Sequence, residues 1–356
     1  FKASWNISDH ELEMFQKTPP PYWRAERTAR RNKDFQERKL DRVEYAEDHF
    51  TGASGGTVYT GDGFPKEYYG NIFTGDVAGN LVHRDVLTPQ ESSPTFVASR
   101  EEAEKAREFL ASTDPWFRPV NFSQGPDGHL YVIDYYRQHI ETPVSIPDDL
   151  KVEMDFLNGS EHGRIYRIAP TNAPTIKVLT PDLQNKSTAE LVKLLSHSNR
   201  WWRLQAQRLI LERQDISVVP ELQTLFDQHE DPKIRLHALY TLEGLNSFNE
   251  EMLKKAVNDN YPGIREHGLI LSERFPGCLD MALSKIDDPS IKVAFQATLT
   301  TGDFHREKVV TALAHAITRY GQDPWLQTAV LSSEDGSSGE LLKLLVAQNF
   351  FDTADN

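Results

Sequence analysis

The sequence predicts a multidomain α+β protein in which a partial β-propeller, about two four-stranded blades, is followed by an α-solenoid. Three observations predict this class. Short runs rich in Val, Ile, Tyr and Phe alternate with Gly, Pro, Asp and Asn turns through residues 51–178, as strands do. Through residues 180–350, apolar residues recur at helical spacing, and a phrase typical of helix starts recurs about every 30 residues. The 356 residues leave room for two or three domains.

Composition excludes several classes of function. The chain has 39 Lys and Arg against 53 Asp and Glu, a net charge of −14, which argues against non-specific nucleic-acid binding and against attachment to anionic lipid by charge. The single cysteine, Cys278, excludes an intrachain disulfide, a zinc ribbon and a c-type haem attachment. No run of 18 apolar residues occurs, so no transmembrane segment is predicted. Because the chain starts at Phe1 without a signal-peptide pattern, we expect a mature or excised piece of a longer protein.

Residues 1–50 are predicted to form a charged connector or N-terminal extension. Three prolines, Pro19 to Pro21, precede a basic run from Arg24 to Arg42 in which acidic residues are interleaved. Two interpretations stay open for this run. It is either a solvated helical or irregular connector with local ion pairs, or a docking surface for acidic ligands.

Residues 51–178 are predicted to hold two groups of four short strands, which is typical of two propeller blades. The first group is Thr57–Thr60, Ile72–Asp76, Leu81–Val86 and Thr95–Ser99, and the second is Pro119–Ser123, Leu130–Asp134, Arg164–Ile168 and Thr175–Leu179. Between the groups, Glu101–Ala111 is predicted to be helical, because Ala103, Ala106, Phe109 and Leu110 share one side and acidic residues stand in the first turn.

Residues 180–350 are predicted to form paired helices. Ser187 and Glu190 have the spacing of a capping box. The repeated phrase starts near 199, 231, 260, 288 and 323, with Asp or Asn, often Pro, and then a basic residue. Asp or Asn caps a helix and Pro suits its first turn. We expect the basic residue to pair with an Asp of a neighbouring repeat or to bond helix-end carbonyls; these residues are Arg203, Arg235, Arg265 and Lys292.

Two resemblances add to this interpretation. The phrase "DPKIRLHA" at 231–238 resembles a HEAT repeat. The phrases "DPWFRPVNFSQGPDGHLYVIDYYR" (114–137) and "HGRIYRIAP" (162–170) resemble a bacterial family of membrane-bound dehydrogenases whose propeller is related to those of glucose and sorbosone dehydrogenases. The resemblance implies oxidation of a sugar or alcohol, pyrroloquinoline quinone as cofactor, and a periplasmic or membrane-associated location.

The chain departs from this family in two ways. The family joins a six-bladed propeller to HEAT repeats and a c-type cytochrome, whereas this chain holds only about two blades and no Cys-x-x-Cys-His, hence no haem site. Two blades cannot close a ring. We therefore expect the catalytic base and much of the cofactor cradle on missing blades, and weak or no turnover by this chain alone.

Arg118 is the first candidate for cofactor or substrate binding. It precedes Pro119, which fixes the backbone, and a guanidinium can bind a carboxylate or a quinone oxygen with two hydrogen bonds. The resemblance implies a cofactor contact at this position. The alternative is a salt bridge between blades, to Asp114 or Asp134.

The other candidates flank predicted strands. Asp134 and Arg137 follow a strand and either form a structural pair or face cofactor or substrate at the propeller mouth. His83 is a candidate base, because imidazole titrates near neutrality, and Arg84 beside it is a further cofactor candidate. We assign no metal site. The alternative function is a non-catalytic scaffold, binding a protein partner on the solenoid or a carbohydrate at the propeller-type loops.

Overall fold

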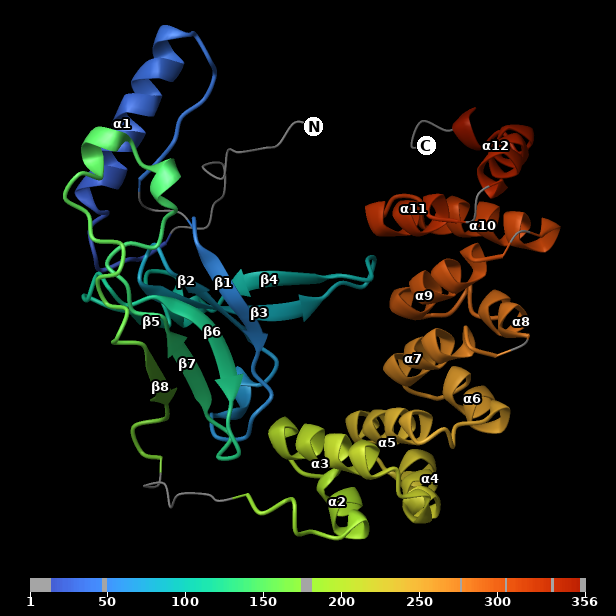
Figure 1. The fold of residues 1–356 in the computed structure, drawn as a ribbon. Coiled ribbons are helices and arrows are strands. Elements are labelled where there is room, and N and C mark those ends of the chain that lie inside the picture. Colours follow the sequence, from blue (N-terminus) through green and yellow to red (C-terminus); the bar gives the residue numbers. More distant parts are fainter. Residues whose placement is uncertain are drawn as a thin grey trace. The chain divides into compact units, whose positions relative to one another are not determined.

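The structure, a computed structural model, shows antiparallel sheets in the N-terminal part of the chain and helices in the C-terminal part, so the α+β class is confirmed (Figure 1). It describes residues 14–46, 50–173, 181–275, 277–304, 306–333 and 336–352. These form two compact units. Unit 1 comprises Phe1–Leu87, Ala98–Pro181 and Ser198–Trp201, and unit 2 comprises Thr88–Val97, Asp182–His197 and Trp202–Asn356.

The first sheet is a meander in which neighbouring strands follow one another in sequence. Its strands are β1 (Ala53–Val58), β2 (Ile72–Asp76), β3 (Leu81–Pro89) and β4 (Phe96–Arg100), with β5 (Leu110–Ala111) paired to β3. The register of β1 against β2 shifts between Ser54 and Thr57. Gly55 lies in this bulge with φ +64°, and a Cβ there would meet the Cα of Asn121 at 2.6 Å. Glycine is therefore required where β1 approaches the second sheet.

The second sheet is also an antiparallel meander. It contains β6 (Pro119–Gln124), β7 (Leu130–Asp134) and β8 (Arg164–Ile168), in that order. Ser123 pairs with Tyr131, and Leu130 with Ile168. The strand expected at Thr175–Leu179 lies outside the described residues.

The predicted helix over Glu101–Ala111 is wrong. The segment holds one 3-10 turn, η3 (Glu102–Glu104), and then β5. Pairing with β3 extends Leu110 and Ala111, and two acidic residues are drawn into buried ion pairs. Glu104 binds Arg84, and Glu108 binds His83 and Arg100. These long-range contacts outweigh the local helical pattern.

The two sheets share one hydrophobic core. The Tyr59 hydroxyl crosses between them and donates to the Gly128 carbonyl at 2.6 Å. Burial raises the pKa of Tyr59 to about 12, so it remains a donor at neutral pH. The buried side chains of this core come from both meanders: Tyr59, Phe73, Val82, Phe117, Phe122, Leu130 and Val132.

The charged N-terminal segment forms one helix, α1 (Tyr22–Glu37), as one of its two interpretations expected. Ion pairs one turn apart, Arg30 with Glu26 and Arg38 with Asp34, stabilise it. The helix is also anchored, because Trp23 is only 4% exposed. It runs beside the loop that carries the 3-10 turns η4 (Pro143–Ser145) and η5 (Asp148–Leu150) (Figure 1).

Unit 2 is built from successive helices (Figure 1). Ser187 and Glu190 form the predicted capping box at α2 (Thr188–Leu194). Helices start at all five copies of the repeated phrase: α3 (Arg200–Arg213), α5 (Pro232–Gly244), α7 (Pro262–Ser272), α9 (Ile291–Gly302) and α11 (Pro324–Leu331). Between them lie α4 (Val219–Gln228), α6 (Glu250–Val257), α8 (Cys278–Leu283) and α10 (Glu307–Tyr320), and α12 (Ser337–Ala347) follows α11. In the described part of the chain, no helix combines the length and apolarity needed to cross a bilayer.

The predicted role of the repeated basic residue is confirmed at three positions. Arg265 binds Asp288 with two hydrogen bonds of 2.6 and 2.8 Å, and Arg235 binds Asp259 in the same way. Arg203 donates to a carbonyl oxygen in the turn before its helix. Lys292 differs, because its ammonium lies 3.5 Å from the centre of the Phe96 ring.

Candidate functional site

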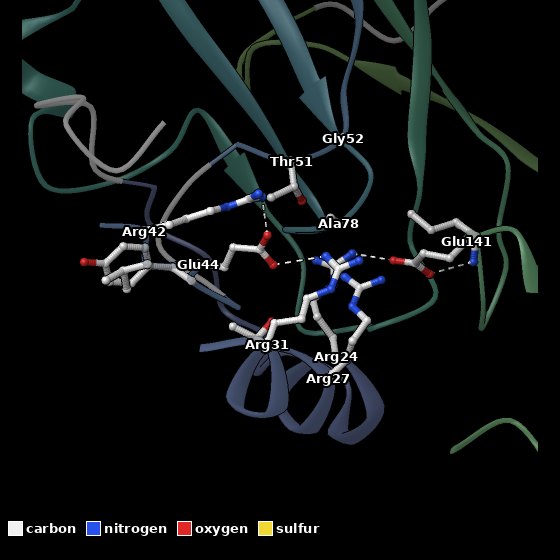
Figure 2. A pocket seen from close by; sticks show the side chains of 13 residues that line it. Arg24, Arg27, Arg31, Arg42, Glu44, Thr51, Gly52, Ala78 and Glu141 are labelled. Atoms are coloured by element: carbon white, nitrogen blue, oxygen red, sulfur yellow. Dashed lines mark hydrogen bonds and ion pairs between the residues drawn. The ribbon is translucent and has the colours of Figure 1, made fainter. Parts of the chain in front are cut away.

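A cavity of about 390 Å³ lies in unit 1 between α1 and the turns at one end of the first sheet (Figure 2). We call it the arginine cavity. Four arginines and two glutamates line it, so its lining has an excess of positive charge in a chain whose net charge is −14. The lining residues are Arg24, Arg27, Thr28, Arg31, Arg42, Val43, Glu44, Tyr45, Thr51, Gly52, Ala78, Ile140 and Glu141.

Helical periodicity places three of the arginines together. Arg24, Arg27 and Arg31 are three and four residues apart, which puts them on one face of α1. The segment after α1 returns along that face, because Asn32 donates to the Glu44 carbonyl at 2.7 Å and accepts from the Glu44 amide at 2.8 Å. This return brings Arg42 to the cavity.

The two glutamates offset two of these four positive charges. Glu44 takes a hydrogen bond from Arg42 at 2.5 Å and one from Arg31 at 3.1 Å. Glu141, from the loop after β7, accepts from Arg24 at 2.5 Å. Figure 2 shows Glu44 and Glu141 approaching the arginine side chains from opposite sides.

Arg27 is the cavity arginine that has no carboxylate within ion-pair distance among the described residues. Its Nη1 makes one long hydrogen bond, 3.4 Å, to the Ser145 carbonyl, and its guanidinium lies over the Trp23 ring at 5.1 Å. Its Nε is buried with no hydrogen-bond partner. Burial, and then repulsion from Arg31 and Arg24, lower the pKa of Arg27.

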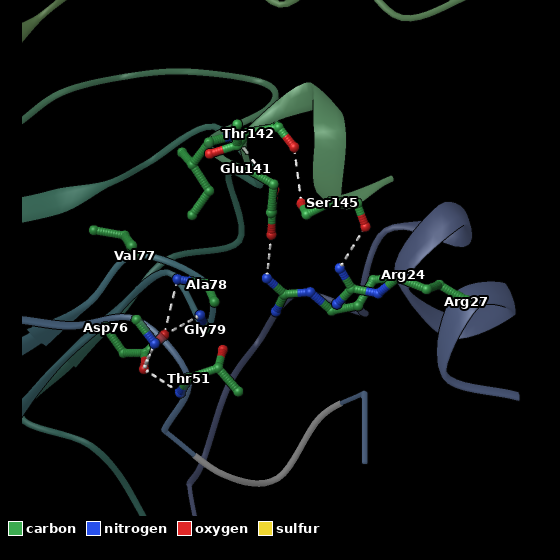
Figure 3. Close-up of polar contacts among 12 residues, drawn as sticks. Arg24, Arg27, Thr51, Asp76, Val77, Ala78, Gly79, Glu141, Thr142 and Ser145 are labelled. Carbon is green, nitrogen blue, oxygen red and sulfur yellow. Dashed lines mark hydrogen bonds and ion pairs between the residues drawn. The ribbon is translucent and has the colours of Figure 1, made fainter. Parts of the chain in front are cut away.

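Asp76 holds the opposite wall (Figure 3). This buried carboxylate ends β2 and accepts four backbone hydrogen bonds. Thr51 and Gly52 donate to one oxygen at 2.9 and 3.0 Å, and Ala78 and Gly79 donate to the other at 2.8 and 2.7 Å. Asp76 therefore fixes two loops against each other, and these loops form the wall that faces α1.

The structure engages Arg118 internally. Its Nε, Nη1 and Nη2 donate to the carbonyls of Arg137, Val77 and Gln138 at 2.8, 2.5 and 2.8 Å. The side chain is 4% exposed, and burial lowers its pKa to about 10, so it is protonated at neutral pH. Its guanidinium thus binds carbonyls from the turn after β2 and from the loop after β7. The alternative interpretation expected the carboxylate of Asp114 or Asp134 instead. A cofactor carboxylate at Arg118 would have to displace these bonds.

Asp134 and Arg137 lie at the same strand end but are not paired with each other. Asp134 accepts from the backbone amides of Arg118 and Tyr136, and burial raises its pKa. Arg137 donates to the carbonyls of Tyr135, Tyr136 and Gly159. Both side chains thus hold the loop after β7.

His83 and Arg84 belong to the buried ion pairs of β3. Nδ1 of His83 lies 2.8 Å from Glu108 and Nε2 lies 3.0 Å from Asp85. Burial lowers the pKa of His83, but these two carboxylates outweigh it, so the net shift is upward. Arg84 donates to Glu104 at 3.0 Å and to Asn71 at 3.2 Å. Two carboxylates that favour the protonated imidazole make His83 a poorer candidate for a general base.

The sequence shows the basic run of residues 24–42 but not the cavity. The spacing of Arg24, Arg27 and Arg31 was a signal for a shared helix face. No sequence signal shows that Glu44 and Glu141 meet this face, since one returns after a turn and the other is more than 100 residues away. The cavity holds donors for an anion, and the described residues that line it include no Ser, Cys or His for nucleophilic catalysis. Among the described residues, no group of three or more His, Cys, Asp and Glu could hold a metal ion.

Comparison with known protein families gives a match in the N-terminal part of the chain. Residues 6–172 match the model of a domain of unknown function, DUF7133. The matched range contains α1, both sheets and every residue of the arginine cavity, and it ends before the helices of unit 2. No curated protein matches the chain.

Proposed function

We propose that this chain is the C-terminal part of a quinone-dependent sugar or alcohol dehydrogenase. In this proposal the two sheets are the last blades of a propeller and the helices of unit 2 are a HEAT-like scaffold. The parent protein would be periplasmic or membrane-associated. The chain alone would not turn over, because a propeller needs its remaining blades to close.

The arrangement of the two sheets is the observation that carries the proposal. Each contains an antiparallel meander of strands that follow one another in sequence, β1 to β4 in the first sheet and β6 to β8 in the second, as in a propeller blade, and β5 is an extra strand paired to β3. The two pack through a shared core, and Arg118 joins the turn after β2 to the loop after β7. Such a strut between adjacent sheets suits blades that must hold a fixed angle. The repeated helices of unit 2 follow the sheets in the chain, and this order of modules is the same as in the dehydrogenase family that the sequence resembles.

Pyrroloquinoline quinone is the cofactor that the resemblance implies. Its carboxylates call for guanidinium donors, but Arg84, Arg118 and Arg137 are engaged by oxygens of the chain itself. These residues therefore do not fit the role of its cradle. We place the main cofactor contacts on the missing blades and assign no catalytic step to this chain.

The test is dye-linked oxidation by two purified proteins, this chain and the product of its whole parent reading frame. With pyrroloquinoline quinone added, we expect the parent to oxidise a sugar or an alcohol and this chain to be inactive. A parent inactive on a broad panel of sugars and alcohols would overturn the proposed chemistry. Comparable oxidation by this chain alone would show that the missing blades are not needed.

A protein-binding scaffold is the second candidate. The observation that favours it is an apolar cavity of about 350 Å³ among α10, α11, α12 and η7 (Phe350–Asp352). Leu331, Leu342 and Phe351 are at least half exposed there. The parent reading frame distinguishes the two candidates. Further blades upstream and a Cys-x-x-Cys-His downstream favour the enzyme, and their absence favours the scaffold.

A further inference from the structure

We propose that the arginine cavity binds a small oxyanion, a molecule that carries a carboxylate or phosphate group, with Arg27 as its principal contact. This site is separate from the residues that the dehydrogenase resemblance implies. The inference does not rest on the proposed function, because it uses only contacts within unit 1.

Charge is the first argument. Four guanidinium groups face two carboxylates in a cavity of about 390 Å³, and an oxyanion would restore the balance. The whole chain is acidic, with a net charge of −14, so this local excess is not part of a general basic surface. A cavity of this size admits a small molecule and suits a compact ligand.

Unused donors are the second argument. The other cavity arginines each meet a carboxylate at 2.5 to 3.1 Å, whereas Arg27 meets only a carbonyl at 3.4 Å. Its Nε is buried without a partner. A buried Nε without a hydrogen-bond partner is costly, and an oxyanion would supply charge-assisted bonds in the fork geometry that arginine prefers.

Preorganisation is the third argument. Trp23, which is 4% exposed, supports the Arg27 guanidinium from one side. The Asn32 bonds fix Glu44, and the Asp76 bonds fix the facing wall at Thr51 and Gly52. Little ordering of the chain is then needed on binding, which favours affinity for a small ligand.

The experiment is calorimetric titration of the purified chain, at low ionic strength, with citrate and with inorganic phosphate as separate probes. We expect saturable binding of at least one, weakened by added sodium chloride. Citrate binding alone would identify a carboxylate ligand, and phosphate binding alone a phosphate ligand. Saturable binding of neither probe at millimolar concentration would overturn the proposal.

Two substitutions with opposite expected signs make the test specific. Arg27→Gln removes the principal donor and should weaken binding about tenfold or more. Glu44→Gln removes a competing carboxylate, frees Arg31 and Arg42, and should tighten binding. Arg38→Gln is the matched control, since Arg38 lies just beyond α1, outside the cavity lining. Equal affinity of wild type and both cavity variants would refute the site, and Glu44→Gln decides alone if Arg27→Gln does not fold.

Discussion

Arg118 is a charged side chain whose guanidinium donates its hydrogen bonds to backbone carbonyls. It draws the carbonyls of Val77, Arg137 and Gln138 to one point at the ends of both sheets. Buried carbonyls without donors are costly, and hydrogen bonds from a charged group are stronger than neutral ones. Its conformation is therefore a condition for the packing of the two sheets rather than a consequence of ligand binding.

Arg118→Met should destabilise unit 1 by roughly 3–5 kcal/mol, because three carbonyl oxygens lose their donors together. The measurement is urea unfolding followed by the fluorescence of the aromatic core. Arg38→Met, which removes the same charge from an exposed ion pair, should cost about 0–1 kcal/mol. Equal stability of both variants would contradict a structural role for Arg118.

His83 makes the stability of unit 1 depend on pH. Its pKa is raised in the folded chain, so its contribution is complete below about 6.5, the usual histidine value, and is lost as pH rises through the folded pKa. Burial raises the pKa of Glu108, but hydrogen bonds from His83 and Arg100 outweigh burial, so the net shift of this pKa is downward. The contribution of Glu108 to stability is therefore present above about pH 4.3, the usual glutamate value, and is lost as pH falls through the folded pKa. The two contributions overlap in weakly acidic solution.

His83→Gln should therefore lower the free energy of unfolding by about 2 kcal/mol near pH 5.5 and by less above about pH 8. Thermal unfolding at a series of pH values measures this difference. His315→Gln is the control, because His315 is about half exposed and pairs with an exposed Asp287. A difference that grows with pH would show that the folded chain does not stabilise the protonated His83.

At the scale of elements, the sequence correctly predicted the helix starts that are stabilised by side chains close to them in the chain. The capping box at Ser187 and the helix starts after Asp231 and Asp323 are formed by side chains within three residues of the backbone they cap. The predicted helix over Glu101–Ala111 is absent because acidic residues of this segment pair with His83 and Arg84 on β3. A local sequence pattern carries no information about such distant partners. The arginine cavity is intermediate: the sequence shows the basic face of α1 but not the glutamates that meet it.

Arg235 and Arg265 each link a helix start of unit 2 to the turn of the next repeat. Asp288→Ala should leave the buried Arg265 without its partner and cost about 3–5 kcal/mol in urea unfolding followed by far-UV circular dichroism. Asp227→Ala breaks an exposed pair with Lys255 and should cost about 0–1 kcal/mol. Arg265→Met combined with Asp288→Leu should recover part of the loss; a double variant as unstable as the sum of its single variants would show that the two residues act independently.

At the scale of the whole molecule, the segment before the sheets, described over residues 14–46, has a different role in the structure from the one that its sequence suggests. The sequence marks it as a charged connector, since its acidic and basic residues alternate and a proline break precedes it. In the structure its few apolar and polar anchors decide its place: Trp23 is buried, Phe15 donates its amide to Glu108, and Thr18 donates to Asn80. Anchors this sparse carry no periodic signal, so only three-dimensional packing identifies the segment as part of unit 1.

Removing the segment should therefore weaken unit 1 and leave unit 2 unchanged. In a chain that starts at Phe50, the amides of β6 and β7 should exchange hydrogen faster, because the sheets lose the packing of Trp23 and the contacts to Asn80, Glu108 and Glu141. The free energy of unfolding of unit 1 should fall by more than the roughly 3–5 kcal/mol expected from truncating one buried tryptophan. Hydrogen exchange measured by mass spectrometry tests this, with α5 and α7 of the same molecule as the internal control. Unchanged protection of β6 and β7 would mean that the segment is only a connector.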